Sequence, residues 1–172
     1  MNDKLLRKEY NPFFENYVSL ALNTNNDIIK NMYLSFDRFY LLLSNLPEDK
    51  HLYAYDDKKW TVKELISHII DTERILTYRA LCISRNHNGR LQPFDENEFV
   101  ENSNANEIPF NELINEFTLL RKATIAMFNS FNAELLIRKG ILNNVDTSVR
   151  ALGYIISGHV LHHLNILEER YL

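Results

Sequence analysis

The stretch GHVLHHLNILEERYL (158–172) ends the chain with apolar residues at helical spacing and three histidines among them. His159 and His163 are four residues apart, which on an α-helix places them about 40° apart around the axis and about 6 Å apart along it. They share a face with Leu152 and Ile156, so they occupy positions that would otherwise belong to an apolar core. Such a pair either binds one metal ion or packs in the core with hydrogen-bond partners.

A further histidine lies in the helix that has the clearest start in the sequence. The segment WTVKELISHIIDTERILTYRALCISR (60–85) has Thr61 near its beginning and Glu64 three residues later, which is the pattern of a capping box. His68 lies on the apolar face of this helix, about a third of the way along it. It therefore occupies a core position, as the pair in the last helix does.

The same reasoning predicts two more long helices. Apolar residues three and four apart predict one over residues 28–46, with Asp27 as its N-cap and Pro47 after its end. The same spacing predicts another from Pro109 to about residue 128, and a short helix over 12–22 precedes them all. Together with the two histidine-bearing helices, these segments predict an all-α fold, a four-helix bundle.

The connections between the helices indicate how they are ordered. The stretch RLQPFDENEFVENSNANEIP (90–109) between the second and third long helices is longer than a helical hairpin needs. This crossover permits those two helices to run parallel, in an up-down-down-up bundle whose second and fourth helices are antiparallel. A second stretch, RKGILNNVDT (138–147), is expected to be irregular, and the last helix is expected to begin at Thr147 or Ser148.

This topology places His68 at the same depth in the bundle as His159 and His163. Without a metal, each buried imidazole has to find hydrogen-bond partners, at a cost of about 1–3 kcal/mol for every group left unpaired. With a divalent ion, each ring supplies one lone pair, and at least one coordination position stays open, which is typical of catalytic sites. The sequence therefore predicts one divalent metal ion per chain, and core histidines without metal remain the alternative.

Other polar residues near these positions have weaker claims to a role. Asp71 lies one turn after His68 and is a candidate catalytic residue that orients His68 or lies near the metal, although a surface charge is an equal alternative. His162 is a rival ligand, but it lies about 100° away from its neighbour around the helix, so we expect it at the rim. His51 and His87 lie in predicted connections, where we expect them to be solvated.

Three arginines and several aromatic residues could also contribute to a pocket. Arg79, Arg121 and Arg170 lie on inward faces, where they bind an anionic group of a substrate or, more commonly, pair with carboxylates at the end of a bundle. Trp60 and Tyr154 are expected in the core or in the pocket wall.

Composition limits the class of protein. With 172 residues, 45% of them hydrophobic and 24% charged, the chain is expected to form a single domain over 1–172. The net charge of −4 and the absence of a basic stripe argue against nucleic acid as a partner. We expect no signal peptide and no membrane span, because no window approaches about 18 unbroken apolar residues. The single cysteine, Cys82, excludes an internal disulfide and fits a reducing, cytoplasmic compartment.

The two histidine-bearing segments resemble the DinB-like four-helix-bundle superfamily. The resemblance rests on KKWTVKELISHIIDTERILTYRAL (58–81) and TSVRALGYIISGHVLHHLNILEERYL (147–172), with a tryptophan eight residues before His68 and the motif G-H-x-x-x-H in the last helix. It covers nearly the whole chain from about Pro12 onwards. The nearest branch is the DinB/YfiT-like one, which includes metal-dependent hydrolases and bacillithiol transferases.

The resemblance implies an up-down-down-up bundle, often homodimeric, with a divalent metal ion such as zinc or nickel. Carried over by position, the ligands are His68, His159 and His163. It further implies an enzyme that acts on a small-molecule substrate, with a low-molecular-weight thiol or water as the nucleophile. The pocket mouth would then be lined by the connection 86–109. The alternative is a non-catalytic metal- or ligand-binding dimer of the stress response, favoured by the lack of a glutamate beside the histidines.

Overall fold

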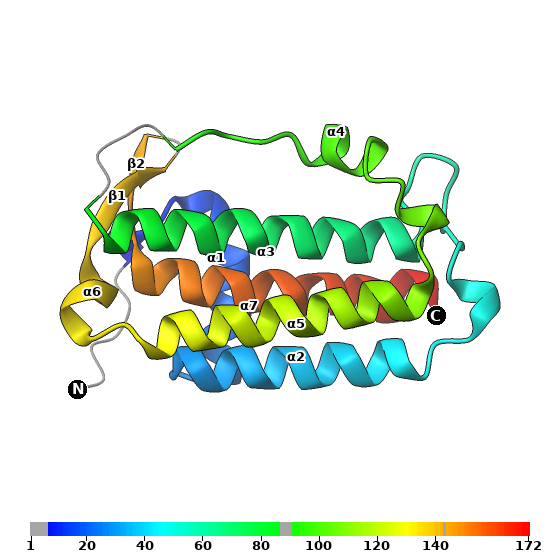
Figure 1. Ribbon diagram of the computed structural model, residues 1–172, viewed down its shortest axis with the longest axis horizontal. Coiled ribbons are helices and arrows are strands. Elements are labelled where there is room, and N and C mark those ends of the chain that lie inside the picture. Colours follow the sequence, from blue (N-terminus) through cyan, green and yellow to red (C-terminus); the bar gives the residue numbers. More distant parts are fainter. Residues whose placement is uncertain (1–6, 87–90, 143) are drawn as a thin grey trace.

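The computed structural model of the chain, which describes residues 7–86, 91–142 and 144–172, is mostly helical. Four long helices lie side by side along the longest axis of the molecule (Figure 1). They are α2 (Ile28–Ser44), α3 (Val62–Ser84), α5 (Phe110–Asn129) and α7 (Val149–Ile166).

Shorter elements cover the sides and ends of these four helices. The α-helices among them are α1 (Glu15–Thr24), α4 (Glu96–Glu101) and α6 (Ala133–Ile137). Single 3₁₀ turns occur at Arg7–Glu9, Pro12–Phe14, Glu48–Lys50 and Ala105–Glu107, and a π-helical turn, Leu167–Tyr171, continues α7. Within the described ranges, no helix combines the length and the apolar character needed to cross a membrane.

Local signals in the sequence account for where three of the long helices begin. Thr61 and Glu64 form the predicted capping box, since the Thr61 hydroxyl accepts a hydrogen bond from the Glu64 amide at 3.1 Å while the Glu64 carboxylate accepts one from the Thr61 amide at 2.7 Å. Asp27 caps α2, where it accepts from the Lys30 amide, as predicted. Ser148, one of the two residues considered, caps α7.

The directions of the helices determine which residues meet. Figure 1 shows α2 and α7 running in one direction and α3 and α5 in the other, with the connection that carries α4 returning along the length of α3. Contacts between side chains agree, because Arg74 and Thr77 of α3 meet Glu116 and Thr124 of α5 in the same order along both helices. Helices α3 and α7 run antiparallel and pack against each other.

One predicted irregular stretch, residues 138–147, contains a β-hairpin, so that prediction is wrong. Strand β1 (Lys139–Leu142) pairs antiparallel with β2 (Val145–Ser148), and Lys139 lies opposite Ser148. Asn144, in the turn, has a φ of 64°, a left-handed conformation that asparagine adopts more readily than most residues. Strands of four residues are too short to show a clear two-residue periodicity, so no distinct strand pattern is visible in this stretch.

A buried ion pair links three of the long helices. Arg121 of α5 is 1% exposed, and its guanidinium donates to both carboxylate oxygens of Glu73 on α3, with the shortest contact 2.7 Å. It also donates to the Met32 carbonyl at 2.8 Å and to the Ser35 hydroxyl at 2.9 Å, both on α2. These contacts satisfy a charge that would otherwise be costly to bury, so Arg121 is a structural residue rather than a ligand-binding one.

Close packing of α1 against α7 depends on a glycine. A Cβ atom added at Gly158 would overlap the backbone carbonyl of Tyr17 on α1, so a larger residue cannot be placed there without moving the helix. The close approach puts the Tyr17 ring edge-on to the His159 ring, with centroids 5.4 Å apart. Gly158 therefore fixes where an aromatic wall stands beside the histidines.

We predict that Arg121→Met lowers the free energy of unfolding by about 3–5 kcal/mol, because it leaves the Glu73 carboxylate buried without its cation. Urea denaturation followed by circular dichroism measures this change. The matched control, Arg74→Met, removes an exposed pair with Glu116 and is expected to cost less than about 1 kcal/mol. Equal losses in the two variants would contradict the role assigned to the buried pair.

We also predict that Gly158→Ala destabilises the protein by about 1–3 kcal/mol through overpacking against Tyr17. This loss is expected although alanine is the better helix former by about 1 kcal/mol. Thermal or urea unfolding checks the prediction, with Ser157→Ala on the same helix as the control, for which we expect about 1 kcal/mol or less. A Gly158→Ala protein as stable as the parent would show that α1 adjusts freely.

Candidate metal centre

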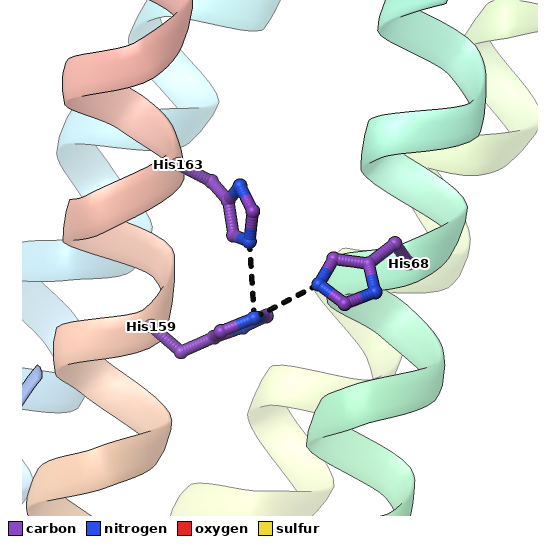
Figure 2. Close-up of side chains that lie close together, drawn as sticks. All are labelled: His68, His159 and His163. Carbon is purple, nitrogen blue, oxygen red and sulfur yellow. Dashed lines mark hydrogen bonds between the residues drawn. The ribbon is translucent and has the colours of Figure 1, made fainter. Parts of the chain in front are cut away.

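The structure brings His68, His159 and His163 together in the interior of the bundle. His68 projects from α3 toward the other two, which project from successive turns of α7 (Figure 2). The His159 Nε2 atom lies 3.0 Å from His68 Nε2 and 3.1 Å from His163 Nε2. One possible ligand atom from each ring lies within 4.8 Å of the others. The three imidazoles therefore converge on one point, as their helical positions predict.

Neighbouring aromatic rings hold two of these histidines in place. Trp60, just before α3, packs on the His68 ring with centroids 4.7 Å apart. The backbone of Trp60 is held by the Tyr171 hydroxyl, which donates a hydrogen bond to the Trp60 carbonyl at 2.8 Å. On the other side, Tyr17 contacts His159 edge-on. The rings are thus confined before any ligand binds.

Burial keeps all three imidazoles neutral. Burial, and to a lesser extent the neighbouring charge of His162, lowers the pKa of His68 to about 4. Burial and the proximity of the other imidazoles hold the pKa of His159 and of His163 well below the usual value near 6.5. At neutral pH each ring therefore has a free lone pair, which is the form that binds metal ions.

The hydrogen bonding within the cluster is incomplete without a further partner. A neutral imidazole nitrogen is either a donor or an acceptor, so His159 Nε2 has to serve both neighbouring nitrogens with one proton or one lone pair. Buried polar groups are normally paired, so the crowding at His159 Nε2 indicates a site for a ligand at this point. His163 Nδ1 is also buried without a hydrogen-bond partner within the described part of the chain, but it is the ring nitrogen that points away from the cluster (Figure 2).

The donor set fits a divalent transition metal ion. Nitrogen ligands bonded about 2.1 Å from one ion lie roughly 3.0–3.4 Å apart, depending on the coordination number. Two of the three separations, 3.0 and 3.1 Å from His159 Nε2, lie in this range, and the third is within 4.8 Å. Imidazole nitrogens are also the donors that zinc, nickel and copper prefer in proteins.

A cavity of about 320 Å³ opens beside the cluster. The connection between α3 and α5 contributes Pro93, Phe94 and Glu96, as expected for the pocket mouth. The N-terminal segment contributes Phe13, Phe14 and Tyr17, which were not expected in a pocket. The remaining walls come from Trp60 and from residues of α3 and α7, namely His68, Thr72, Leu76, Arg79, Ile155, His159 and His163.

Tyr17, on the N-terminal side of the cavity, has a hydroxyl with an altered pKa. Burial and the negative charge of Glu96 raise this pKa above its usual value. The hydroxyl therefore stays protonated at physiological pH. Its position could have been suspected from aromatic residues spaced three and four apart, Phe13, Phe14 and Tyr17, but nothing in the sequence indicates which helix they cover.

Asp71 does not share this cavity. Its carboxylate lies 3.6 Å from the Arg74 guanidinium and lines a separate surface hollow with Glu98 and Phe99. Burial raises its pKa, and the charge of Arg74 opposes that shift. The catalytic role suggested for Asp71 stays a prediction, and these contacts do not favour it.

The other candidate histidines are not part of the cluster, although the His162 ring is in edge contact with the His163 ring, with centroids 5.1 Å apart. His162 is half-buried at the rim, 3.4 Å from the Asn16 side chain and in edge contact with Tyr17, as predicted. His51 was expected to be solvated, but its ring stacks flat on Phe110 with centroids 3.6 Å apart, so that prediction is wrong. His87 lies outside the described residues.

The three candidate arginines lie in different environments. Arg121 belongs to the buried ion pair with Glu73, and Arg170 is exposed. Arg79 is 7% exposed and lines the cavity beside the histidines.

Solved structures with a similar fold are distant in sequence. YfiT from Bacillus subtilis, a probable metal-dependent hydrolase with an unusual four-helix bundle topology, matches with a TM-score of 0.72 and 12% identity, over 96% of this chain and 90% of that one. The mycothiol-dependent maleylpyruvate isomerase matches with a TM-score of 0.66 and 13% identity, over 88% of this chain and 59% of that one. At these identities the likeness concerns the fold, and it identifies a four-helix bundle of the YfiT type.

Sequence comparison extends this likeness to a family. No curated protein matches the chain at a significant level. A family model for the DinB superfamily matches residues 32–167, a range that includes all of the long helices except the start of α2 and that contains the three clustered histidines. The chain therefore belongs to the DinB superfamily.

Proposed function

We propose that the protein binds a divalent metal ion through His68, His159 and His163 and uses it to act on a small molecule. The observation that carries this proposal is the convergence of three buried, neutral imidazoles beside a cavity of about 320 Å³. The proposal extends to one ion per chain, with zinc or nickel as the favoured metals. Three nitrogen donors without a carboxylate suit these ions and leave a coordination position for a substrate.

The favoured reaction is the transfer of a low-molecular-weight thiol to an electrophilic carbon, and hydrolysis is the second possibility. A divalent ion held by three neutral ligands lowers the pKa of a thiol or a water molecule that binds it. In the transfer, the sulfur forms a bond to carbon while the carbon loses its leaving group, and the thiol proton passes to solvent. YfiT, described as a probable metal-dependent hydrolase, and the mycothiol-dependent isomerase support these two versions by analogy of fold.

The residues of the chain supply the environment for this chemistry. The three histidines hold their lone pairs available because burial keeps them unprotonated. The aromatic side chains of Phe14, Tyr17, Trp60 and Phe94 line the cavity and give an apolar substrate surfaces to contact. Tyr17 retains its proton and is a hydrogen-bond donor among these side chains.

A non-catalytic module that binds a metal or a small ligand in the stress response is the alternative function. It is favoured by the composition of the cluster, in which all three residues are histidines and no carboxylate takes part. Asp71, the residue suggested for proton handling, faces Arg74 and a different hollow. Proton transfer in an enzyme would then depend on solvent or on the bound nucleophile itself.

Several broader features belong to the same proposal. The whole chain, 1–172, is taken as one domain whose long helices follow the up-down-down-up order, supported by their directions in Figure 1. A homodimer is supported by exposed apolar residues on the outer face of α2, Tyr33, Leu34, Tyr40 and Leu41. A cytoplasmic location is supported by the single, unpaired Cys82.

We predict that the protein, purified without a polyhistidine tag, contains close to one divalent metal ion per chain by elemental analysis. His163→Ala is expected to lower the metal content at least tenfold, because two imidazoles bind a divalent ion much more weakly than three. His162→Ala is the matched control, since the neighbouring ring lies at the rim and should leave the metal content unchanged. Less than a tenth of an ion per chain after metal is offered would favour core histidines without metal.

We further predict that the metal-loaded protein accelerates the reaction of a small thiol with an alkyl halide or an epoxide. The rate with the metal-loaded protein should exceed that with the metal-free protein at least tenfold, because ionisation of the thiol is the assisted step. A screen of several thiols, with His163→Ala and His162→Ala in parallel, measures this difference. If the metal accelerated neither the reaction of any thiol nor the hydrolysis of an ester, the non-catalytic module would be favoured.

A further inference from the structure

Arg79 differs from the other buried arginine in what surrounds it. Of the arginines whose side chains the structure describes, Arg79 and Arg121 are the buried ones, at 7% and 1% exposure. Arg121 is satisfied by the Glu73 carboxylate, the Met32 carbonyl and the Ser35 hydroxyl. Among the described residues, Arg79 makes one hydrogen bond, from Nη2 to the Gln92 carbonyl at 2.6 Å, and its guanidinium lies 5.9 Å from the centroid of the Phe94 ring.

The charge of Arg79 has no carboxylate partner within the described part of the chain. The ion pairs found there use Arg74, Arg121, Arg138 and Arg150. A guanidinium has five N–H donors, and a buried charge is normally paired, so most of the donor capacity of Arg79 remains unused. Burial lowers its pKa, which is the response of a cation without an anionic neighbour.

The unused donors of Arg79 lie on the cavity that contains the histidines. His68, Thr72, Leu76 and Arg79 all line this cavity and follow one another along one face of α3. Arg79 is about three helical turns, or roughly 16 Å along the axis, from His68. Long side chains on a helix generally lean toward the preceding turn, which for Arg79 is the direction of the histidines.

A second polar group between these ends also lacks a partner. Thr72 lines the cavity, and its buried hydroxyl has no hydrogen-bond partner among the described residues. Threonine hydroxyls within helices usually donate to the carbonyl one turn earlier, which Thr72 does not do. The α3 wall thus offers two unsatisfied polar groups to whatever fills the cavity.

We infer that Arg79 binds a carboxylate group of the substrate, which places the reacting atom of that substrate toward the three histidines. The inference rests on the proposed function and deepens it by naming an anionic, largely apolar or aromatic substrate. The planar guanidinium matches the two oxygens of a carboxylate. A single cation, in a cavity that also contains the Glu96 carboxylate, suits a singly charged group better than a dianionic phosphate.

Two matched probes test the inference on the metal-loaded protein. They are 4-(trifluoromethyl)phenylacetate and its neutral amide, which share an aromatic body and differ in charge, and fluorine NMR titration measures their dissociation constants. We expect the parent protein to bind the carboxylate at least tenfold more tightly than the amide. Arg79→Gln should reduce this preference to less than twofold, whereas Arg79→Lys, which keeps the charge, should retain at least a threefold preference.

The controls separate this role from a structural one. Arg38→Gln removes an exposed arginine on α2 and should leave the tenfold preference intact. If Arg79 only held the Gln92 segment in place, Arg79→Gln would weaken both probes equally and keep their ratio, which would overturn the inference. A preference that persists in Arg79→Gln, as expected if the carboxylate bound the metal alone, would also overturn it, as would equal or undetectable binding of both probes to the parent.

Metal analysis of the same samples distinguishes the two proposals. Arg79→Gln is expected to contain as much metal as the parent, since the arginine is remote from the histidines. A parent protein that binds no metal but still prefers the carboxylate would refute the proposed metal function and support the anion site. A parent protein with full metal content and no preference would do the reverse.

Discussion

The antiparallel packing of α3 against α7 is the constraint on which the centre of this protein depends. It is this contact that brings His68 to within 3.0 Å of His159, although 90 residues separate them in the chain. A shift of one residue along either helix would rotate an imidazole by about 100° and move it by about 1.5 Å, enough to break the convergence. The capping box at the start of α3 and the Ser148 cap of α7 therefore help to position the histidines as well as the helices.

Polar groups in the interior fall into two kinds. The Arg121–Glu73 pair is saturated with hydrogen bonds and ties α2, α3 and α5 together, so it stabilises one arrangement of the bundle. The histidine cluster, Thr72 and Arg79 are buried as well but leave donors or lone pairs unused. Unsatisfied buried groups cost stability, and the ligand proposed for the cavity would complete those that line it.

Much of this arrangement could be predicted from the sequence, because helical signals are local. The apolar stripes and the capping residues Asp27, Thr61 and Ser148 locate the helices, and the long connection before α5 suggests which helices are antiparallel. The positions of the three histidines on those stripes then follow from helical geometry. The three histidines are then expected to meet, because the depth predicted for His68 in the bundle coincides with that predicted for His159 and His163.

Features made by contacts between distant segments could not be predicted in the same way. The hairpin over 139–148 is too short to carry a periodic signal, and the stacking of His51 on Phe110 joins two separate connections. Arg79 and Arg121 occupy similar positions in the pattern, and only tertiary packing supplies Glu73 to one of them. Sequence spacing indicates which side of a helix a residue faces, but it does not identify the residue of another segment that contacts it there.

Part of the cavity is lined by residues that precede the range matched by the family model. The DinB superfamily match begins at residue 32, after Phe13, Phe14 and Tyr17, while the histidines all fall inside it. One wall of the cavity is therefore built from chain that precedes the matched range and is docked on α7 through the close approach at Gly158. Changes at Phe13 or Phe14 would alter the shape of the cavity, whereas changes at Tyr17 would also reach His159, whose ring it contacts.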